Sequence, residues 1–169
     1  MNVPNILTLF RLLLIPVFVI IFFSSVPHSL LYSIFVFLLA GFTDILDGYI
    51  ARKFDLITKW GTVLDPLADK LMLTAVLTCL VIAALAPLWV LIIITTKELL
   101  MIIAGIILYR KNSVIPSNSF GKISTCLFYI SIFTLAFDVR FGDYLLYIAV
   151  LSAIIAFINY FILYYNNKI

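Results

Sequence analysis

Four aspartates are the residues of this chain whose types and spacing are best suited to chemistry. The 169 residues include only eight acidic ones, and four of these form two pairs, Asp44 with Asp47 and Asp65 with Asp69. Residues three or four apart lie on one face of a helix, so each pair would project two carboxylates together. Intramembrane acids need partners, and hard oxygen ligands suit Mg²⁺, Mn²⁺ or Ca²⁺. The pattern therefore predicts a divalent-metal site.

A simpler interpretation makes these aspartates helix caps, salt-bridge partners or solvated loop charges. It suits a single aspartate, and Asp55, which lies in a basic loop, fits it. Four aspartates at helical spacing in so acid-poor a chain favour the metal site instead. No histidine or cysteine lies nearby to favour zinc, since His28 falls in another loop and Cys79 and Cys126 lie in apolar stretches.

Small residues and an arginine accompany the aspartates. Gly48 and Ala51 follow Asp47 by one and four residues, Arg52 comes next, and Gly61 opens the following apolar stretch. Glycine lets a ligand or another backbone approach closely, although each small residue alone could equally serve helix packing. An arginine can bind phosphate through two parallel hydrogen bonds. Together with the acids, these residues suggest a site for a nucleotide diphosphate held through metal.

Residues 44–69 resemble the signature of the CDP-alcohol phosphatidyltransferase family, D-x2-D-G-x2-A-R-x8-G-x3-D-x3-D. The stretch 44–52 reads DILDGYIAR, and it is followed after eight residues by Gly61 and then by Asp65 and Asp69. All eight fixed positions of this highly specific signature are matched. The family's six membrane spans also agree with the apolar blocks of the chain, so the resemblance covers essentially all of it.

The resemblance implies a role for each matched residue. Asp44, Asp47 and Asp65 would be metal ligands, and Asp69 would complete the metal site and act as general base on the acceptor hydroxyl. The cofactor would be Mg²⁺ or Mn²⁺, with a two-metal site expected. The cytidine and diphosphate of the donor would be held by Asp47, Gly48, Ala51, Arg52 and Gly61. The acceptor oxygen would attack the phosphatidyl phosphorus and CMP would leave.

A second polar pattern lies near the N-terminus, within an otherwise apolar first span. Asn5, Thr8 and Arg11 occur at steps of three, so they share one helical face. This stripe could be interfacial capping with a snorkelling arginine. The stretch 4–11 also resembles the start of bacterial phosphatidylglycerophosphate synthases, which favours a role in lining the substrate pocket. We therefore expect Asn5 and Thr8 to bind the donor nucleotide and Arg11 to bind the acceptor.

Further cations fall on the predicted cytoplasmic side. Arg110, Lys111 and Lys122 lie near Ser119 and Ser124, and they could bind either an acceptor phosphate or anionic lipid headgroups. We assign these three residues, together with Arg11, to binding of the acceptor. Lys97 and Glu98 are neighbours in the middle of an apolar stretch, where a structural ion pair is the expected role.

The elements that carry these residues are predicted to be transmembrane helices. Hydrophobic residues make up 65% of the chain and charged residues only 11%, whereas soluble domains average about 25% charged. A membrane-crossing helix needs about 20 predominantly apolar residues. We predict an all-α, polytopic protein of one domain, residues 1–169, in which residues 1–5 form a short interfacial segment. The six predicted spans are 6–23, 29–51, 61–84, 88–109, 119–137 and 142–165.

The distribution of basic residues predicts the orientation of the chain. With the N-terminus inside, one side receives Arg11, Arg52, Lys53, Lys59, Arg110, Lys111, Lys122 and Lys168, while the other receives only Arg140. Cytoplasmic loops collect Lys and Arg, so both termini and the loop beside the aspartates should be cytoplasmic. The expected location is the cell membrane, with a multi-pass topology.

The resemblance implies transfer of the phosphatidyl group of CDP-diacylglycerol to glycerol 3-phosphate, with release of CMP. The same chemistry with another acceptor, chiefly phosphatidylglycerol, would make a cardiolipin synthase instead. A divalent-cation transporter would explain the aspartates but not the Gly48, Ala51, Arg52 and Gly61 spacing, and transporters place polar groups near the midplane. The expected partners are these substrates, membrane lipids and, from the resemblance alone, a second copy of the chain. No nucleic acid is expected.

Overall fold

The computed structural model describes residues 3–54, 59–110, 119–137 and 139–166, and these residues form six helices without any strand. This confirms the prediction of an all-α protein. The helices are α1 (Val3–Phe22), α2 (Ser29–Lys53), α3 (Lys59–Ile82), α4 (Leu88–Arg110), α5 (Ser119–Leu135) and α6 (Val139–Asn166). The helix α1 begins at Val3, so residues 3–5, predicted to form an interfacial segment, already belong to it. Pro4 suits this position, because the first turn of a helix tolerates a residue without an N–H.

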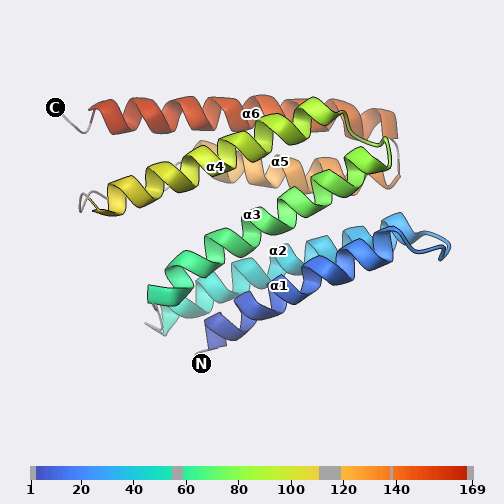
Figure 1. Cartoon of the computed structure of the whole chain (residues 1–169), viewed down its shortest axis with the longest axis horizontal. Helices are drawn as coiled ribbons and strands as arrows, with labels where there is room; N and C mark the ends of the chain where they lie inside the picture. The colour runs from blue at the N-terminus through green and yellow to red at the C-terminus, as the bar shows by residue number, and fades with distance from the viewer. Residues whose placement is uncertain (1–2, 55–58, 111–118, 138, 167–169) are drawn as a thin grey trace. The chain divides into compact units, whose positions relative to one another are not determined.

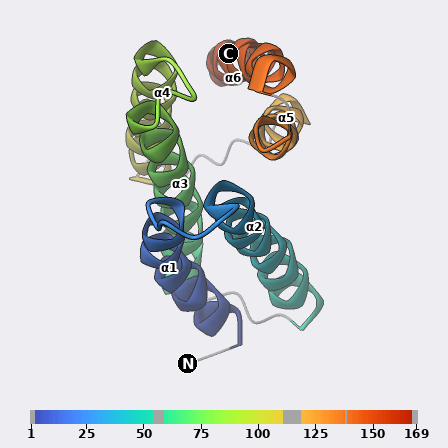
Figure 2. The same cartoon turned by 90° about the vertical axis from the view of Figure 1, so that its right-hand side faces the viewer.

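The helices fall into two compact units, Met1–Ala83 and Ala84–Ile169. In the first unit, α1 packs against both α2 and α3 (Figures 1 and 2). The three helices alternate in direction, so the start of α1, the end of α2 and the start of α3 lie at one end of the unit (Figure 1). The core of this unit includes Phe18, Ile34, Phe37, Met72 and Val76, each at most 1% exposed. The aspartates of α2 and α3 therefore lie at the same end as the polar stripe of α1.

In the second unit, α5 packs along α6, and α4 contacts α6 as well. Gly142 allows the close approach of α6 to the end of α5, because a Cβ at this position would lie 2.7–2.8 Å from atoms of Leu135. The rings of Trp89 and Tyr147 stack with their centroids 5.4 Å apart and join α4 to α6. Lys97 and Glu98 form the predicted ion pair in α4, with Nζ 2.6 Å from Oε1.

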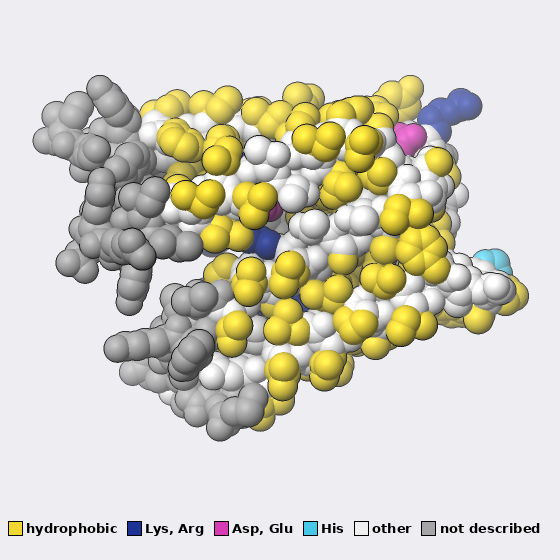
Figure 3. Space-filling model, viewed as in Figure 1, with side chains coloured by type: hydrophobic (Ala, Val, Ile, Leu, Met, Phe, Trp, Pro, Cys, Tyr) yellow, Lys and Arg dark blue, Asp and Glu magenta, His cyan; other side chains and the backbone are white. Residues whose placement is uncertain are grey.

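The outer surface of the helices is largely apolar. Figure 3 shows hydrophobic side chains distributed across the visible face, with backbone and other side chains between them. On α1, Leu13 and Ile20 are 59% and 70% exposed. So many exposed large apolar side chains suit hydrocarbon rather than water. Among the described residues, three helical segments are long and apolar enough to cross a membrane, not the six predicted: Pro4–Phe22, Ser29–Ala51 and Val139–Ile162.

The other three helices differ in charge or length. The first half of α3 carries Asp65, Asp69 and Lys70, while α4 carries Lys97 and Glu98. At 17 residues, α5 is shorter than a typical span. Asp65, Asp69 and Lys70 lower the hydropathy of α3, whereas α4 remains strongly apolar despite Lys97 and Glu98.

Candidate active site

Arg11 is the centre of the polar cluster at this end of the first unit. Its side chain projects from α1, is 1% exposed and reaches both aspartates of α2. Nη1 lies 2.6 Å from Asp44 Oδ1, and Nη2 donates a hydrogen bond to Asp47 Oδ2 at 2.5 Å. Asp47 is almost fully buried, whereas the Asp44 side chain is 41% exposed. The spacing of three on α2 thus presents two carboxylates to one guanidinium, as a shared helical face requires.

Thr8, one turn before Arg11, connects α1 to Asp65 of α3. Its buried hydroxyl lies within hydrogen-bond distance of Asp65 Oδ1 and, at 3.1 Å, of the Pro4 carbonyl oxygen. A hydroxyl has one proton, so it can donate to only one of these acceptors at a time. The predicted stripe of Asn5, Thr8 and Arg11 therefore faces protein, and two of its members contact the motif aspartates directly.

The carboxylates of α2 and α3 lie near one another. Asp44, Asp47 and Asp65 are close enough for their negative charges to interact unfavourably. The guanidinium of Arg11 offsets part of this repulsion, since opposite charges attract strongly where water is scarce. Asp69 lies on α3 one turn beyond Asp65, is partly buried, and its charge acts on the neighbouring Lys70.

The donor atoms suit a divalent cation in type. All are carboxylate oxygens, which Mg²⁺ and Mn²⁺ prefer. Their arrangement is that of ion-paired side chains, because Arg11 contacts an oxygen of Asp44 and of Asp47. In the described part of the chain, no three acidic, histidine or cysteine side chains are arranged to hold a metal ion. The four predicted ligands thus fit the metal by chemistry, and Arg11 occupies the space between two of them.

The remaining predicted site residues are distributed as follows. Gly48 and Ala51 follow Asp47 on α2 and are partly buried, Asn5 is partly buried on α1, and Gly61 is buried on α3. Lys122 is exposed on α5, in the second unit. The side chains of Arg52 and Arg110, residue Lys111 and the loop residue Asp55 lie outside what the structure describes. The donor and acceptor roles of these residues stay predictions.

Two features were missed by reasoning from the sequence. The first is the pairing of Arg11 with the aspartates, since Arg11 was expected to bind the acceptor. The polar stripe on α1 was a usable signal, because buried acids need a cation and Arg11 was available. The second is an apolar groove, for which the sequence offers no signal, since it depends on how the side chains of two helices meet.

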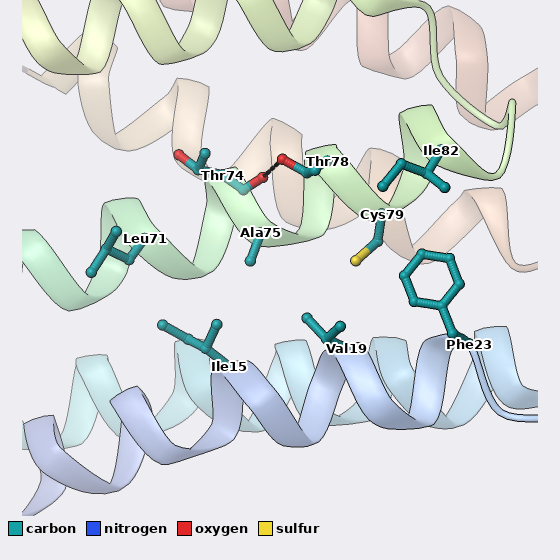
Figure 4. Close-up of a pocket in the computed structure, with 9 residues that line it drawn as sticks. All are labelled: Ile15, Val19, Phe23, Leu71, Thr74, Ala75, Thr78, Cys79 and Ile82. Atoms are coloured by element: carbon teal, nitrogen blue, oxygen red, sulfur yellow. Dashed lines mark hydrogen bonds between the residues drawn. The ribbon is translucent and has the colours of Figure 1, made fainter.

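The groove lies between α1 and α3 and encloses about 440 Å³. Figure 4 shows Ile15, Val19 and Phe23 on the α1 side, facing Leu71, Ala75 and Cys79 on the α3 side. Thr74, Thr78 and Ile82 complete the lining. The hydroxyl of Thr78 donates to the Thr74 carbonyl oxygen at 2.7 Å, so α3 itself satisfies this polar group. The groove begins about one helical turn beyond Arg11 and runs away from the aspartates.

Comparisons with known proteins agree with the motif. A CDP-diacylglycerol–glycerol-3-phosphate 3-phosphatidyltransferase of Bacillus subtilis is 36% identical over 180 residues, covering 95% of this chain and 93% of the relative. A protein of the same name from Wigglesworthia glossinidia brevipalpis is 33% identical over 175 residues, with the same two coverages. A Schizosaccharomyces pombe protein, named as a fusion of a CMP-forming cardiolipin synthase and a mitochondrial hydrolase, is 40% identical over 117 residues. That match covers 69% of this chain and 19% of the relative.

The sequence model of one family matches residues 1–158, which include both the stripe on α1 and the aspartates of α2 and α3. With eight matched motif positions grouped on two helices that pack against α1, the chain belongs to the CDP-alcohol phosphatidyltransferase family.

Proposed function

We propose that this chain transfers the phosphatidyl group of CDP-diacylglycerol to a hydroxyl of glycerol 3-phosphate. The products are phosphatidylglycerophosphate and CMP, so the reaction belongs to phospholipid biosynthesis. The observation that carries the proposal is the match over 95% of the chain to two relatives that bear the name of this activity. The complete family signature, with Asp44, Asp47 and Asp65 gathered around one face of α1, supports it.

The proposed mechanism assigns the proton transfer to Asp69. Its carboxylate takes the proton of the acceptor hydroxyl while the oxygen attacks the phosphatidyl phosphorus. The bond between that phosphorus and the CMP oxygen breaks, and CMP leaves with the electron pair. Divalent cations held by the four motif aspartates, Mg²⁺ or Mn²⁺, would offset negative charge on the diphosphate. Gly48, Ala51 and Gly61 leave room for the cytidine diphosphate, which Arg52 binds.

A cardiolipin synthase activity is the second candidate, and the Schizosaccharomyces pombe relative favours it. Its acceptor would be phosphatidylglycerol, a lipid whose phosphate carries one negative charge. Glycerol 3-phosphate is instead a soluble dianion, which calls for several cations on the cytoplasmic side. Arg110, Lys111 and Lys122 are proposed for that role, with anionic lipid headgroups as the alternative ligand. The near-complete coverage of the two bacterial relatives makes glycerol 3-phosphate the preferred acceptor.

A comparison of acceptors tests the proposed function. Purified enzyme in detergent, supplied with CDP-diacylglycerol and Mg²⁺ or Mn²⁺, should release CMP when glycerol 3-phosphate is added. Phosphatidylglycerol, inositol and serine at the same concentration should give less than about a tenth of that rate, because a missing charged hydrogen bond costs about 1.5–3 kcal/mol. Turnover with phosphatidylglycerol but none with glycerol 3-phosphate would establish the cardiolipin synthase instead.

The proposal includes the topology predicted from the sequence. Residues 1–169 form one catalytic domain that crosses the cell membrane six times, with both termini and the site on the cytoplasmic side. The distribution of Lys and Arg supports this orientation. Helices α3 to α5 would cross the membrane inside a bundle, where neighbouring helices shield their charged or short segments.

The groove between α1 and α3 is proposed to hold an acyl chain of the donor. Its walls continue from the helices that carry Arg11 and Asp65, so a lipid whose diphosphate lies at the aspartates would extend along it. From Leu71 to Ile82 the α3 wall rises about 16 Å, at roughly 1.5 Å per residue. This is about half of the hydrocarbon thickness of roughly 30 Å, which suits one acyl chain of one leaflet.

Substitution of Ala75→Phe, which fills the middle of the groove, should lower kcat/KM for long-chain CDP-diacylglycerol about threefold. The effect is modest, about 0.7 kcal/mol, because the displaced chain moves into hydrocarbon rather than water. A donor with six-carbon chains should be unaffected. Ile20→Phe, on an exposed position of α1, is the matched control. An equal loss with both donors would argue against an acyl site, and a changed oligomeric state would indicate a second copy in the groove.

A further inference from the structure

Arg11 has a role that the proposed reaction does not assign. We propose that its guanidinium is the counter-ion of the metal-free site, and that divalent cations displace it from Asp44 and Asp47. The inference rests on the proposed function in one respect, the identity of these aspartates as metal ligands. It concerns the residues of this chain when they hold no metal, and it makes Arg11 a determinant of metal affinity.

The first argument is the position of the guanidinium. At 1% exposure, Arg11 is among the most buried large side chains of the chain, although it is the most polar of them. An unpaired charge at such a position would be costly, so its contacts with Asp44 and Asp47 are needed for the metal-free fold. Removing one partner of a buried ion pair leaves the other uncompensated. Arg11 therefore stabilises the two carboxylates, and they stabilise it.

The second argument is the incomplete hydrogen bonding of the same group. A guanidinium has five N–H donors. Nε of Arg11 is buried and has no hydrogen-bond partner among the described residues, whereas Nη1 lies 2.6 Å from Asp44 and Nη2 donates to Asp47. The two contacts thus compensate the charge of the arginine but leave its Nε–H without an acceptor. A group held chiefly by charge can be released when another cation supplies that charge.

The third argument is the balance of charge at the cluster. One guanidinium faces the interacting carboxylates of Asp44, Asp47 and Asp65, so repulsion among them is only partly offset. A divalent cation carries twice the charge, and Mg²⁺ binds carboxylate oxygens at about 2.0–2.1 Å. It would repel the guanidinium strongly at such short range. Metal and Arg11 would therefore compete for the carboxylates of Asp44 and Asp47.

The competition has a measurable consequence for stability. Arg11→Met keeps an unbranched apolar side chain and removes the charge. In EDTA the variant should unfold about 10 °C below the unmodified protein, since a broken buried pair is strongly destabilising. Saturating Mg²⁺ should raise the Tm of the variant by more than that of the unmodified protein and close most of the gap. Isothermal titration should show Mg²⁺ binding to the variant at least about threefold more tightly.

Two further variants separate this role from simple packing. Lys97→Met removes a different cation paired with an acid, in the second unit, and should lower the Tm equally with and without Mg²⁺. Arg11→Lys keeps a positive charge, so it should recover part of the stability in EDTA and bind Mg²⁺ more weakly than Arg11→Met. If Arg11→Met does not fold, the Mg²⁺ affinity of Arg11→Lys can be compared with that of the unmodified protein instead. Arg11→Lys should bind Mg²⁺ more tightly than the unmodified protein, because an ammonium cannot contact both carboxylates in the two-pronged way of a guanidinium.

The inference is overturned if Mg²⁺ shifts the Tm of Arg11→Met and of the unmodified protein equally, or if the variant binds Mg²⁺ more weakly. Weaker binding would make Arg11 a support of the metal site rather than its competitor. These readouts need no substrate, so they are independent of CMP release. Absence of transfer to glycerol 3-phosphate with normal metal competition would overturn the proposed acceptor alone.

Discussion

Chelation of divalent cations should abolish CMP release, and excess Mg²⁺ or Mn²⁺ should restore it. With glycerol 3-phosphate and CDP-diacylglycerol present, we expect EDTA to lower the rate at least about a thousandfold. Metal ions contribute several kcal/mol to the stabilisation of charge on transferring phosphoryl groups, and each 1.36 kcal/mol changes the rate tenfold. The measurement is CMP release after EDTA, followed by titration of each metal.

The physical reason lies in the charge of the cluster. The donor diphosphate is an anion, and Asp44, Asp47 and Asp65 are already near enough to repel one another. Without cations, the diphosphate would add negative charge to a site that has too much of it. Arg11 offsets part of the charge in the protein alone, as its two short contacts indicate. It cannot also offset the negative charge of the substrate diphosphate.

Matched variants make the metal test specific. Asp44→Asn should raise the concentration of Mg²⁺ that gives half of the maximal rate, whereas Asp143→Asn, outside the motif on α6, should leave it unchanged. Addition of the preformed Mg²⁺–EDTA complex controls for effects of the chelator on the detergent micelle. Full activity in thoroughly chelated buffer would exclude the metal mechanism and leave the aspartates as ion-pair partners only.

The helices could be predicted well from the sequence because apolar blocks and charge set their limits. The structure places the end of α2 at Lys53 and the start of α3 at Lys59, each within two residues of the prediction. The start of α1 differed more. Asn5 was assigned to an interfacial segment, but Pro4 fits the first turn of a helix, so the helix includes it.

The contacts within the site were harder to predict. Helical spacing shows that Asp44 and Asp47 share a face, but not which residue of a distant helix lies opposite them. Arg11 lies 36 residues before Asp47, and their contact depends on how α1 packs against α2. The groove lined by Ala75 also depends on how two helices pack, so the sequence does not predict it. Hydropathy predicts that α3 is a membrane span, but it does not show which residues shield the charged first half of this helix.

Asp69→Asn should give the largest loss of any single substitution at the site. The change nearly preserves volume but removes the charge and the proton acceptor. Turnover should fall by about 10²–10⁴-fold, the usual contribution of a general base. Binding of CDP-diacylglycerol should weaken less than in Asp44→Asn or Asp47→Asn, since those aspartates are expected to hold the donor through metal.

The resemblance to the family is the reason for expecting a separate role for Asp69, and its position permits that role. Arg11 and Thr8 contact Asp44, Asp47 and Asp65, whereas Asp69 lies one turn further along α3, beside Lys70. A base must reach the acceptor hydroxyl, which approaches the phosphorus on the side away from the leaving CMP. A carboxylate one turn further along α3 can act on the acceptor hydroxyl and still share the metal site with the other three aspartates.

The decisive measurements are turnover, donor binding and thermal unfolding of the same preparations. Asp69→Asn should unfold within a few degrees of the unmodified protein, so that lost turnover cannot be assigned to lost structure. Asp69→Glu restores the carboxylate with one extra methylene and should recover part of the rate, which a role in packing alone would not predict. If Asp69→Asn keeps more than about a tenth of the unmodified rate, Asp69 is not the base. The proton would then pass to another carboxylate of the cluster, and the donor and acceptor sides of the site would have to be reassigned.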